Sequence, residues 1–418
     1  MSKKRVGVLL AASAMAFALL AAGMVMPERA QALEIGPSPT INSTPDDTWM
    51  TNGKVFSIIR SGNYIYVGGQ FSRVQSEVSG GQSFAAKNLA RFHADTGSGD
   101  PTWTPDVTGE DASATRVDAL AEANGKIWVG GRFGAVDGVA RRNLAAVSPD
   151  TGAVDATIDP VVGSQVYMVR AMIVSGQKVY IGGAFGSVDG KARRNLAAID
   201  PVSGNVDPTW KPKADGPVYS LAFSCEGSGV FAGGKFLRAA GSDGAFAPRQ
   251  YIARFDATSG SLHPWAVPAG SFQNESETAS DLAVTCDRIT SGFLGPNFLR
   301  SFRLDSGNTG SVVWEYKTGG ETQTATMLGP NKVIVGGHFS QLKDGVKRTD
   351  LAMINLSDGS VDPSWDVALT GTGGTKAVGP WDLLVDENRL YVGGNFAEIR
   401  TGGSVINQTA FARFTFTP

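Results

Sequence analysis

Four charged residues stand out because each lies near the start of an otherwise apolar segment: Asp118, Arg170, Asp281 and Asp382. Neighbouring carboxylates can bind calcium or act together as a general acid and a general base. A solvated surface on which an aspartate contacts an arginine is the simpler alternative. Trp381 follows a Gly-rich loop and could contact a ligand through its ring. For these five residues, ligand binding ranks ahead of catalysis.

Arginines form a second candidate group. Arg142 and Arg194 each end an Arg-Arg pair, and Arg348 ends a Lys-Arg pair. They could contact an anionic glycan or another anionic partner. Alternatively they are structural and pair with aspartates of the same loops, which are Asp137, Asp189 and Asp344.

Overall composition excludes several classes of protein. The 418 residues carry 37 Lys and Arg against 39 Asp and Glu, a formal net charge of −2, which disfavours an electrostatic nucleic-acid binder. Only two cysteines and three histidines occur, which rules out zinc-ribbon arrays and chains of haem sites. The apolar fraction of 42% is sufficient for a large core.

An internal repeat explains where these candidates lie. A Gly-Gly-x-Phe signature follows a short apolar run in six places, and a decayed seventh copy occupies residues 295–298. The signatures end at Phe71, Phe133, Phe185, Phe236, Phe298, Phe339 and Phe396, so that successive copies are 41 to 62 residues apart. This period fits a four-stranded propeller blade plus its loops.

One copy illustrates the predicted strands. Apolar segments at 117–120, 126–129, 143–147 and 154–158 are separated by the tight-turn pairs Asn124-Gly125 and Thr151-Gly152 and by one longer loop. The runs are nearly continuously apolar, which is typical of strands buried on both faces. We therefore predict an all-β, seven-bladed β-propeller of four-stranded blades. A β-solenoid would require shorter and more regular repeats.

The termini indicate how the ring closes. The last copy ends after its third strand, near residue 414, whereas residues 45–49 resemble the ends of fourth strands at 100–103 and 207–210. An N-terminal strand is therefore expected to complete the seventh blade, which removes an exposed sheet edge.

Position in the repeat also separates structural residues from functional ones. Cys225 and Cys286 occupy equivalent places in the fourth and fifth copies, which predicts a disulfide between blades; two free thiols are the alternative. The histidines occupy different repeat positions, so neither a metal site nor a cofactor is expected. Tryptophans recur at the end of the fourth strand and are predicted to pack between blades, at positions 49, 103, 210, 265, 314 and 365.

The combination of Val-Gly-Gly-x-Phe, Asp-Gly, Arg-Asn-Leu-Ala, Thr-Gly and Asp-Pro-x-Trp resembles the delta-sixty repeat family of bacterial β-propellers. The resemblance covers nearly all of residues 44–418. The chain departs from the family in its tryptophans, where phenylalanine is more frequent, and in its fifth copy, which lacks the usual loop. The resemblance implies a secreted or surface protein and supplies no catalytic motif.

The N-terminus resembles an export signal. Lys3, Lys4 and Arg5 precede an apolar stretch, and Ala30-Gln31-Ala32 has the form of a signal-peptidase site. We predict a signal peptide at 1–32, a linker at 33–43 and the propeller at 44–418. An uncleaved membrane anchor is the alternative, because the apolar stretch is long enough to span a bilayer.

These expectations lead to three functional hypotheses. The first is a secreted or surface-associated monomer that binds an extracellular protein or polysaccharide through the face with long, variable loops. The second is a glycan-cleaving hydrolase or lyase with its site at the channel mouth, and the third is a structural or adhesive surface module. Fold alone does not decide among them. No nucleic-acid partner is expected, and no membrane anchor after cleavage.

Overall fold

The computed structural model describes residues 39–76, 81–163, 168–272, 277–304, 308–372 and 379–417. The expected signal peptide, 1–32, and residues 33–38 of the expected linker lie outside these ranges. Within the described ranges, no helix combines the length and hydrophobicity needed to cross a membrane.

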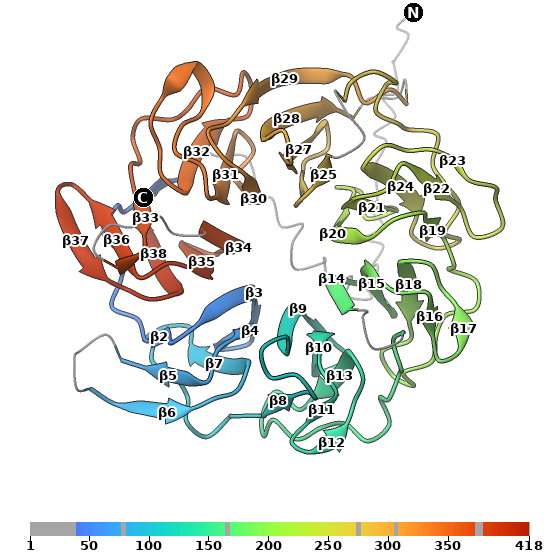
Figure 1. Cartoon of the computed structure of the whole chain (residues 1–418), viewed down its shortest axis with the longest axis horizontal. Helices are drawn as coiled ribbons and strands as arrows, with labels where there is room; N and C mark the ends of the chain where they lie inside the picture. Colours follow the sequence, from blue (N-terminus) through green and yellow to red (C-terminus); the bar gives the residue numbers. More distant parts are fainter. Residues whose placement is uncertain are drawn as a thin grey trace, which may run out of the picture.

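In the described residues, seven antiparallel sheets stand around a central axis as the blades of a propeller (Figure 1). The first strand of each blade lies nearest to the axis, and the following strands pair outward in chain order. The predicted propeller is therefore confirmed. From the axis outward the blades consist of β3 (Lys54–Ser61), β4 (Tyr64–Gln70) and β7 (Leu89–His93); β9 (Arg116–Ala123), β10 (Lys126–Arg132) and β13 (Leu144–Val147); β14 (Met168–Ser175), β15 (Lys178–Ala184) and β18 (Leu196–Ile199); β20 (Val218–Phe223), β21 (Gly229–Gly234) and β24 (Ile252–Asp256); β25 (Thr278–Ala279) with β26 (Ala283–Val284), β27 (Arg288–Leu294), β28 (Phe298–Arg303) and β29 (Val312–Lys317); β30 (Thr322–Leu328), β31 (Lys332–Gly337) and β32 (Leu351–Asn355); and β34 (Gly379–Asp386), β35 (Arg389–Asn395), β38 (Phe411–Thr417) and β1 (Thr40–Ile41).

The fourth strand is much shorter than the sequence predicts in most blades. Five blades reduce it to a single bridge, such as Val147 with Val154, and only blade 5 has a long fourth strand, β29. The cause is a turn at the Asp-Pro-x-Trp segment, where the aspartate side chain accepts the amide two residues ahead and bends the chain away from the sheet. This bond occurs from Thr102 to Asp100, from Thr157 to Asp155, from Thr209 to Asp207 and from Ser364 to Asp362.

The paired glycines allow the backbone to approach closely, as predicted. A Cβ on Gly69 would lie 2.0 Å from the carbonyl oxygen of Lys54 in the adjacent inner strand. A Cβ on Gly68 would lie 2.4 Å from a methyl group of Val117 in the next blade. Opposite this pair, β3 carries one extra residue, a β-bulge at Phe56. A bulge of this kind re-aims a side chain, and here it does so beside the axis.

The N-terminal segment closes the ring, as expected. β1 pairs with β38, and the Asp46 amide donates to the Arg413 carbonyl at 2.8 Å. The Arg413 Nε donates to the Asp46 carboxylate, also at 2.8 Å. The paired strand itself lies at Thr40–Ile41, ahead of the expected segment 45–49 and inside the stretch expected to be a linker.

The connections predicted as variable loops are partly ordered as small outer sheets. Four of these sheets pair a connection between blades with the hairpin that joins the second and third strands, and in blade 3 a single bridge from Val162 to Val188 takes the place of this pairing. In blade 5, residues 295–297 alone join β27 to β28, in line with the loop missing from that copy. The small sheets comprise β2 (Met50–Thr51), β5 (Arg73–Gln75) and β6 (Ser83–Ala85); β8 (Val107–Thr108), β11 (Ala135–Val136) and β12 (Val139–Ala140); β16 (Ser187–Val188) and β17 (Lys191–Ala192); β19 (Lys213–Ala214), β22 (Arg238–Ala240) and β23 (Ala247–Pro248); and β33 (Ala368–Thr370), β36 (Glu398–Thr401) and β37 (Ser404–Asn407), with the short helix η1 (Lys343–Gly345) at the corresponding place in blade 6.

The recurring tryptophans pack between blades, as predicted. Trp103 and Trp210 are fully buried. Their indole N–H groups donate to Ser148 and Asp256, whose carbonyls lie at the end of the third strand of the next blade, at 2.9 and 3.0 Å. Trp265 and Trp314 make corresponding bonds, Trp365 donates to the Asn42 carbonyl just after β1, and Trp49 is half-buried.

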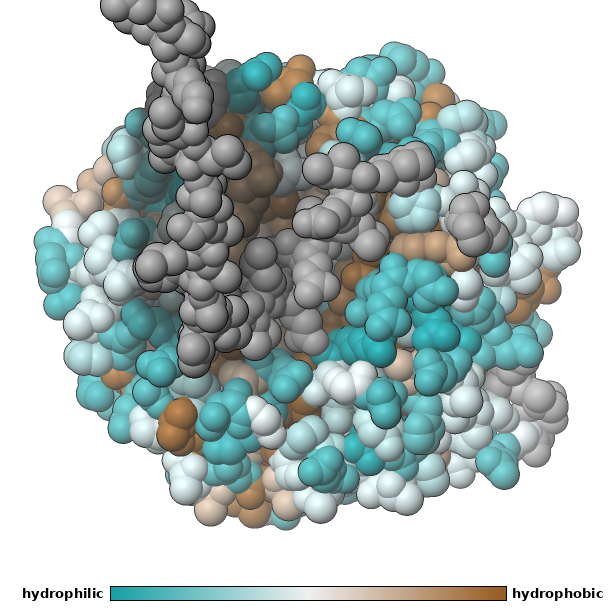
Figure 2. Space-filling view, turned by 180° about the vertical axis from the view of Figure 1, so that it is seen from behind, coloured by the Kyte–Doolittle hydropathy of each residue, from teal (hydrophilic) through white to brown (hydrophobic). Residues whose placement is uncertain are grey.

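The expected disulfide between Cys225 and Cys286 is present, and it joins blades 4 and 5. Both cysteines are exposed. On the face drawn in Figure 2, hydrophilic residues dominate the rim of the disc, and hydrophobic ones are scattered singly over it.

Candidate functional site

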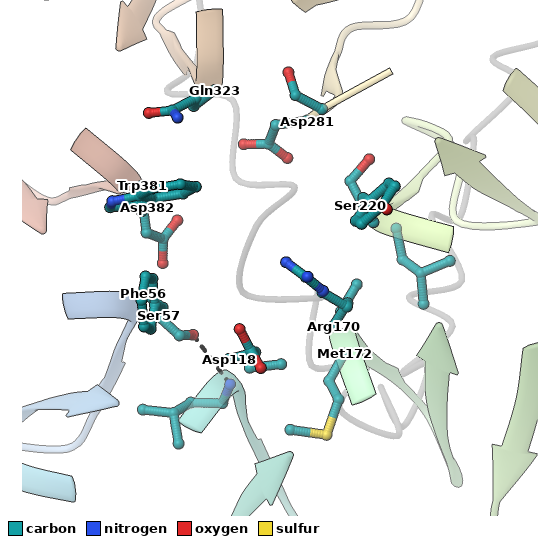
Figure 3. Close-up of a pocket in the computed structure, with 16 residues that line it drawn as sticks. Phe56, Ser57, Asp118, Arg170, Met172, Ser220, Asp281, Gln323, Trp381 and Asp382 are labelled. Carbon is teal, nitrogen blue, oxygen red and sulfur yellow. Dashed lines mark hydrogen bonds between the residues drawn. The ribbon is translucent and has the colours of Figure 1, made fainter. Parts of the chain in front are cut away.

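The β-bulges place one residue per blade against the axial channel. In six inner strands the pairing register skips a residue, and in blade 5 Ser280 lies between the two short pieces of the inner strand. All seven of these residues line one cavity (Figure 3). They are, in blade order, Phe56, Asp118, Arg170, Tyr219, Ser280, Gln323 and Trp381.

The structure brings together five of the eight candidate ligand residues. Asp118, Arg170 and Trp381 are bulged residues, and Asp281 and Asp382 are the residues that directly follow a bulged position. All four inner strands of eight residues, β3, β9, β14 and β34, have the bulge at their third residue. The cavity therefore lies nearer to the connections between blades than to the opposite end of the channel.

The cavity is small. Its volume is about 80 Å³, whereas sites that enclose a drug-sized molecule measure about 300–1,000 Å³. One water requires only about 10–15 Å³ on this scale. The cavity therefore accommodates several waters or one polar group of a larger ligand, and the remainder of that ligand must lie outside the channel.

Two of the carboxylates hold neighbouring blades together. Asp382 of blade 7 accepts the Ile58 amide of blade 1 at 2.7 Å. Asp281 of blade 5 accepts the Ala325 amide of blade 6 at 3.2 Å. Each carboxylate also accepts the amide of the residue after it. These bonds favour a structural role over the acid–base pair that the sequence left open.

Ser57 makes the same type of contact with a hydroxyl group. Its Oγ accepts the Leu120 amide of blade 2 at 3.0 Å. The residue after the bulge therefore recurs as an acceptor for the next blade. This recurrence explains why carboxylates are tolerated at a position where small residues dominate.

Asp118 forms its ion pair with a residue that sequence reasoning missed. Its carboxylate lies 2.9 Å from the Arg116 Nε, and its side chain is only 6% exposed. Burial raises the pKa of the Asp118 carboxyl, and the positive charges of Arg116 and Arg170 offset only part of this effect. Arg116 and Asp118 are two residues apart on β9, so that the strand places both side chains on one face.

Arg170 is the charged group that points into the cavity without a hydrogen bond or ion pair to any described residue (Figure 3). Its guanidinium lies 5.1 Å from the centre of the Tyr219 ring. Burial lowers its pKa, the attraction of the Asp118 carboxylate opposes this shift, and the repulsion from Arg116 adds to it. The sequence suggested an aspartate–arginine contact in the channel, and the arginine within hydrogen-bonding distance of Asp118 is Arg116.

Aromatic rings form another part of the cavity wall. The Trp381 and Phe56 rings meet edge to face, with centroids 5.5 Å apart, and the Arg116 guanidinium lies 5.5 Å from the Phe56 ring. Sequence reasoning missed Phe56, Tyr219 and Gln323. They precede the Gly-Gly pair of their blades by 12 to 14 residues, and this narrow range of spacings is the signal that could have identified them.

The candidate arginines Arg142, Arg194 and Arg348 do not line this cavity. Arg142 and Arg194 are exposed on the rim, and Arg194 lies 5.3 Å from the Phe246 ring. Arg348 is half-buried and lies 3.7 Å from Asp366. The three therefore do not form one site with the channel residues.

The sequence suggested that the candidate arginines, if structural, pair with aspartates of their own loops, but the structure gives these groups other partners. Asp137 and Asp189 accept the amides of Asp106 and Val161 at 2.7 Å each, which fixes the connections between blades. In repeat position, Arg348 corresponds to two buried arginines, Arg141 and Arg193, which donate to backbone carbonyl oxygens, those of Ala140 and Asp155 and of Ala192 and Asp207.

A second hollow, of about 300 Å³, lies beside the disulfide. Its charged groups already have partners, because Arg254 pairs with Glu226. The His263 Nδ1 accepts the Trp265 amide at 3.1 Å, and burial lowers the pKa of this histidine. Among the described residues, no cluster of three or more histidine, cysteine or acidic side chains is suited to hold a metal ion.

Comparisons with known proteins agree with the fold. A family model described as a domain of unknown function (DUF5122) β-propeller matches residues 331–364, which include β31 and β32. No curated protein sequence matches the chain significantly.

Several solved structures resemble the chain over nearly its whole length. The WD40 β-propeller domain of Doa1 is 10% identical, with a TM-score of 0.53 over 91% of this chain and 96% of that one. U3-55K is 9% identical, with a TM-score of 0.53 over 90% and 100%. The computationally designed Ika8 protein is 14% identical, with a TM-score of 0.49 over 90% and 100%. Such identities bear on the fold alone, and the likeness to the WD40 β-propeller domain agrees with the seven blades of the described residues.

Proposed function

We propose that this protein is an exported β-propeller of the delta-sixty repeat type that binds an extracellular polysaccharide at the mouth of its axial channel. The observation that carries the proposal is the convergence of five candidate residues from four blades on one cavity. A propeller is commonly an interaction module, and a rigid ring with varied loops suits recognition.

The chemistry of the cavity favours a polysaccharide over a protein. Tyr219, Phe56 and Trp381 contribute aromatic rings, and Arg170 and Gln323 contribute planar polar groups. Aromatic rings pack against the apolar faces of sugars, and planar polar side chains form paired hydrogen bonds with hydroxyl groups. The small cavity admits one such group, while the surrounding connections between blades are available to the rest of a polymer.

The test measures binding and cleavage together. The purified exported chain is incubated with immobilised envelope and extracellular polysaccharides, and both protein depletion and released soluble fragments are measured. Depletion without fragments is expected. The change Trp381→Ala should weaken this binding at least tenfold, because it removes a ring from the cavity wall.

The matched control is Phe246→Ala, which removes a half-buried aromatic ring from the rim, away from the cavity. It should bind as the unchanged protein does. Release of soluble fragments would mean that the protein cleaves the polysaccharide, and it would overturn the proposal in favour of an enzyme. If no polysaccharide depletes the protein from solution, a crosslinking pull-down from culture envelope follows. Capture of a protein there would overturn the proposal in favour of a protein partner.

A further inference from the structure

The charged side chains that line the cavity differ in whether they already have hydrogen-bond or ion-pair partners in the protein. Asp118 is paired with Arg116, and Asp281 and Asp382 each accept backbone amides of their own and the next blade. Arg170 alone among them has neither a hydrogen bond nor an ion pair to a described residue. The Tyr219 ring lies 5.1 Å from its guanidinium, and the Asp118 carboxylate attracts its charge without pairing with it directly.

The half-buried Arg170 guanidinium has no acceptor among the described residues, so waters or a ligand in the cavity must accept its hydrogen bonds. Removing a guanidinium from bulk water is unfavourable unless acceptors replace its lost hydration. A contact with an aromatic ring offsets only part of this cost. A group that accepts hydrogen bonds in the cavity would therefore recover part of the cost.

The planar fork of arginine matches a carboxylate in particular, because two parallel N–H groups can bind its two oxygens. The carboxylates of Asp281 and Asp382 face the same cavity and oppose a bare anion. They suit a ligand that also offers hydroxyl donors beside its carboxylate. A hexuronic acid unit has this combination, since its carboxylate is attached to a ring that carries hydroxyl groups.

We propose that the channel binds the carboxylate of a uronic acid residue, with Arg170 as the group that holds it. This inference rests on the proposed function and adds the class of polysaccharide. The volume of about 80 Å³ fits the carboxylate and its nearest hydroxyl group, and the remainder of the sugar chain lies at the channel mouth. Trp381 and Phe56 then provide an apolar wall beside the sugar ring.

The experiment compares two forms of one sugar chain. Oligogalacturonate and the same oligomer with its carboxylates methyl-esterified are titrated into the full exported chain by calorimetry at low and high salt. The unchanged protein should bind the acidic form at least tenfold more tightly, and this preference should shrink as salt rises.

Three variants locate the interaction. Arg170→Gln should lose the preference for the acidic form, because its affinity for the acidic form falls much further than its affinity for the esterified form. Arg170→Lys keeps the charge without the planar fork and should retain part of the preference. Arg194→Gln is the matched control, because it removes an exposed rim charge, and it should leave the preference unchanged. Thermal melts of each variant establish that it is folded.

Each result decides between the two proposals. Equal affinity for both forms, or an undiminished preference in Arg170→Gln, overturns the uronate inference and leaves the polysaccharide proposal standing. Failure to bind either form also overturns the inference, and the polysaccharide panel then decides the proposed function separately. Loss of the preference in Arg194→Gln would place the anion site on the rim instead.

Discussion

The Asp382 carboxylate of the last blade accepts the Ile58 amide of the first blade at 2.7 Å, although the two residues are 324 positions apart. This bond lies on the inner strands at the seam where the ring closes. Farther out along the same blade, Arg413 and Asp46 form an ion pair at 2.8 Å. The seam is therefore held both near the axis and away from it.

The inner bond predicts a stability effect rather than a chemical one. Asp382→Ala should lower the free energy of unfolding by about 2 kcal/mol, because it leaves the buried Ile58 amide without its acceptor. Asp382→Asn retains an acceptor oxygen and should cost less. Urea unfolding of both variants measures the difference. A variant as stable as the unchanged protein that has lost a polysaccharide-cleaving activity would instead support the acid–base role.

The outer ion pair predicts that the N-terminal segment stabilises the entire ring. Asp46→Ala should lower the free energy of unfolding by about 2–3 kcal/mol, because the Arg413 side chain, 8% exposed, would lose its carboxylate. Deleting residues 33–54 should lower the melting temperature further, since it also removes β1. Asp47→Ala is the control, because Asp47 is exposed. Equal melting temperatures for the truncated and complete chains would show that the seam does not depend on this segment.

The disulfide predicts a reductant-sensitive interface between blades 4 and 5. Cys225 and Cys286 are 61 residues apart, and a cross-link over such a loop stabilises by at most about 4 kcal/mol. Because both cysteines are exposed, dithiothreitol should lower the melting temperature of the native protein without prior unfolding. A Cys225→Ser, Cys286→Ser variant should melt at the lower temperature and should not respond to the reductant. A response in this variant would point to an effect of the reductant elsewhere.

Much of the fold could be predicted from the sequence, because it depends on local rules that repeat. The Gly-Gly pairs mark close backbone approach, and the tryptophans recur where each blade meets the next. Blade 2 shows that the tryptophan is not invariant, because Ile158 occupies the corresponding position and is also fully buried. The position between neighbouring blades therefore requires a large apolar side chain, but this side chain need not be an indole.

The site was less predictable, because its residues are selected by strand register and not by residue type. The bulged positions contain residues as different as Phe56, Asp118 and Gln323, so no compositional pattern identifies them. Arg348 illustrates a related difficulty. It lies two residues before Asp350, whose φ of 68° matches the 65° of Asn143 and the 67° of Asn195, and that backbone feature is visible only in the structure.

Repeated lysine–aspartate pairs predict sensitivity to acid. Lys126 and Asp155 are 2.7 Å apart, and equivalent pairs join Lys178 to Asp207 and Lys332 to Asp362. Burial alone would raise the pKa of Asp155, but hydrogen bonds from Lys126 and Thr157 outweigh it and lower this pKa to about 2. The pKa values of Asp207 and Asp362 are lowered for corresponding reasons.

The direction of the pH effect follows from these values. Each carboxylate is more acidic in the folded chain than in the unfolded one, so its contribution is complete above about pH 4 and is lost as the pH falls toward 2. For Asp155 the loss is at most about 2 kcal/mol, because its side chain is 21% exposed. Urea unfolding between pH 6 and pH 2 should therefore show falling stability, with a shallower fall in Asp155→Asn. Asp137→Asn, in which the exposed carboxylate is bonded to a backbone amide and not to a lysine, serves as the comparison. Identical pH profiles for Asp155→Asn and the unchanged chain would mean that the lysine pairs contribute little to stability.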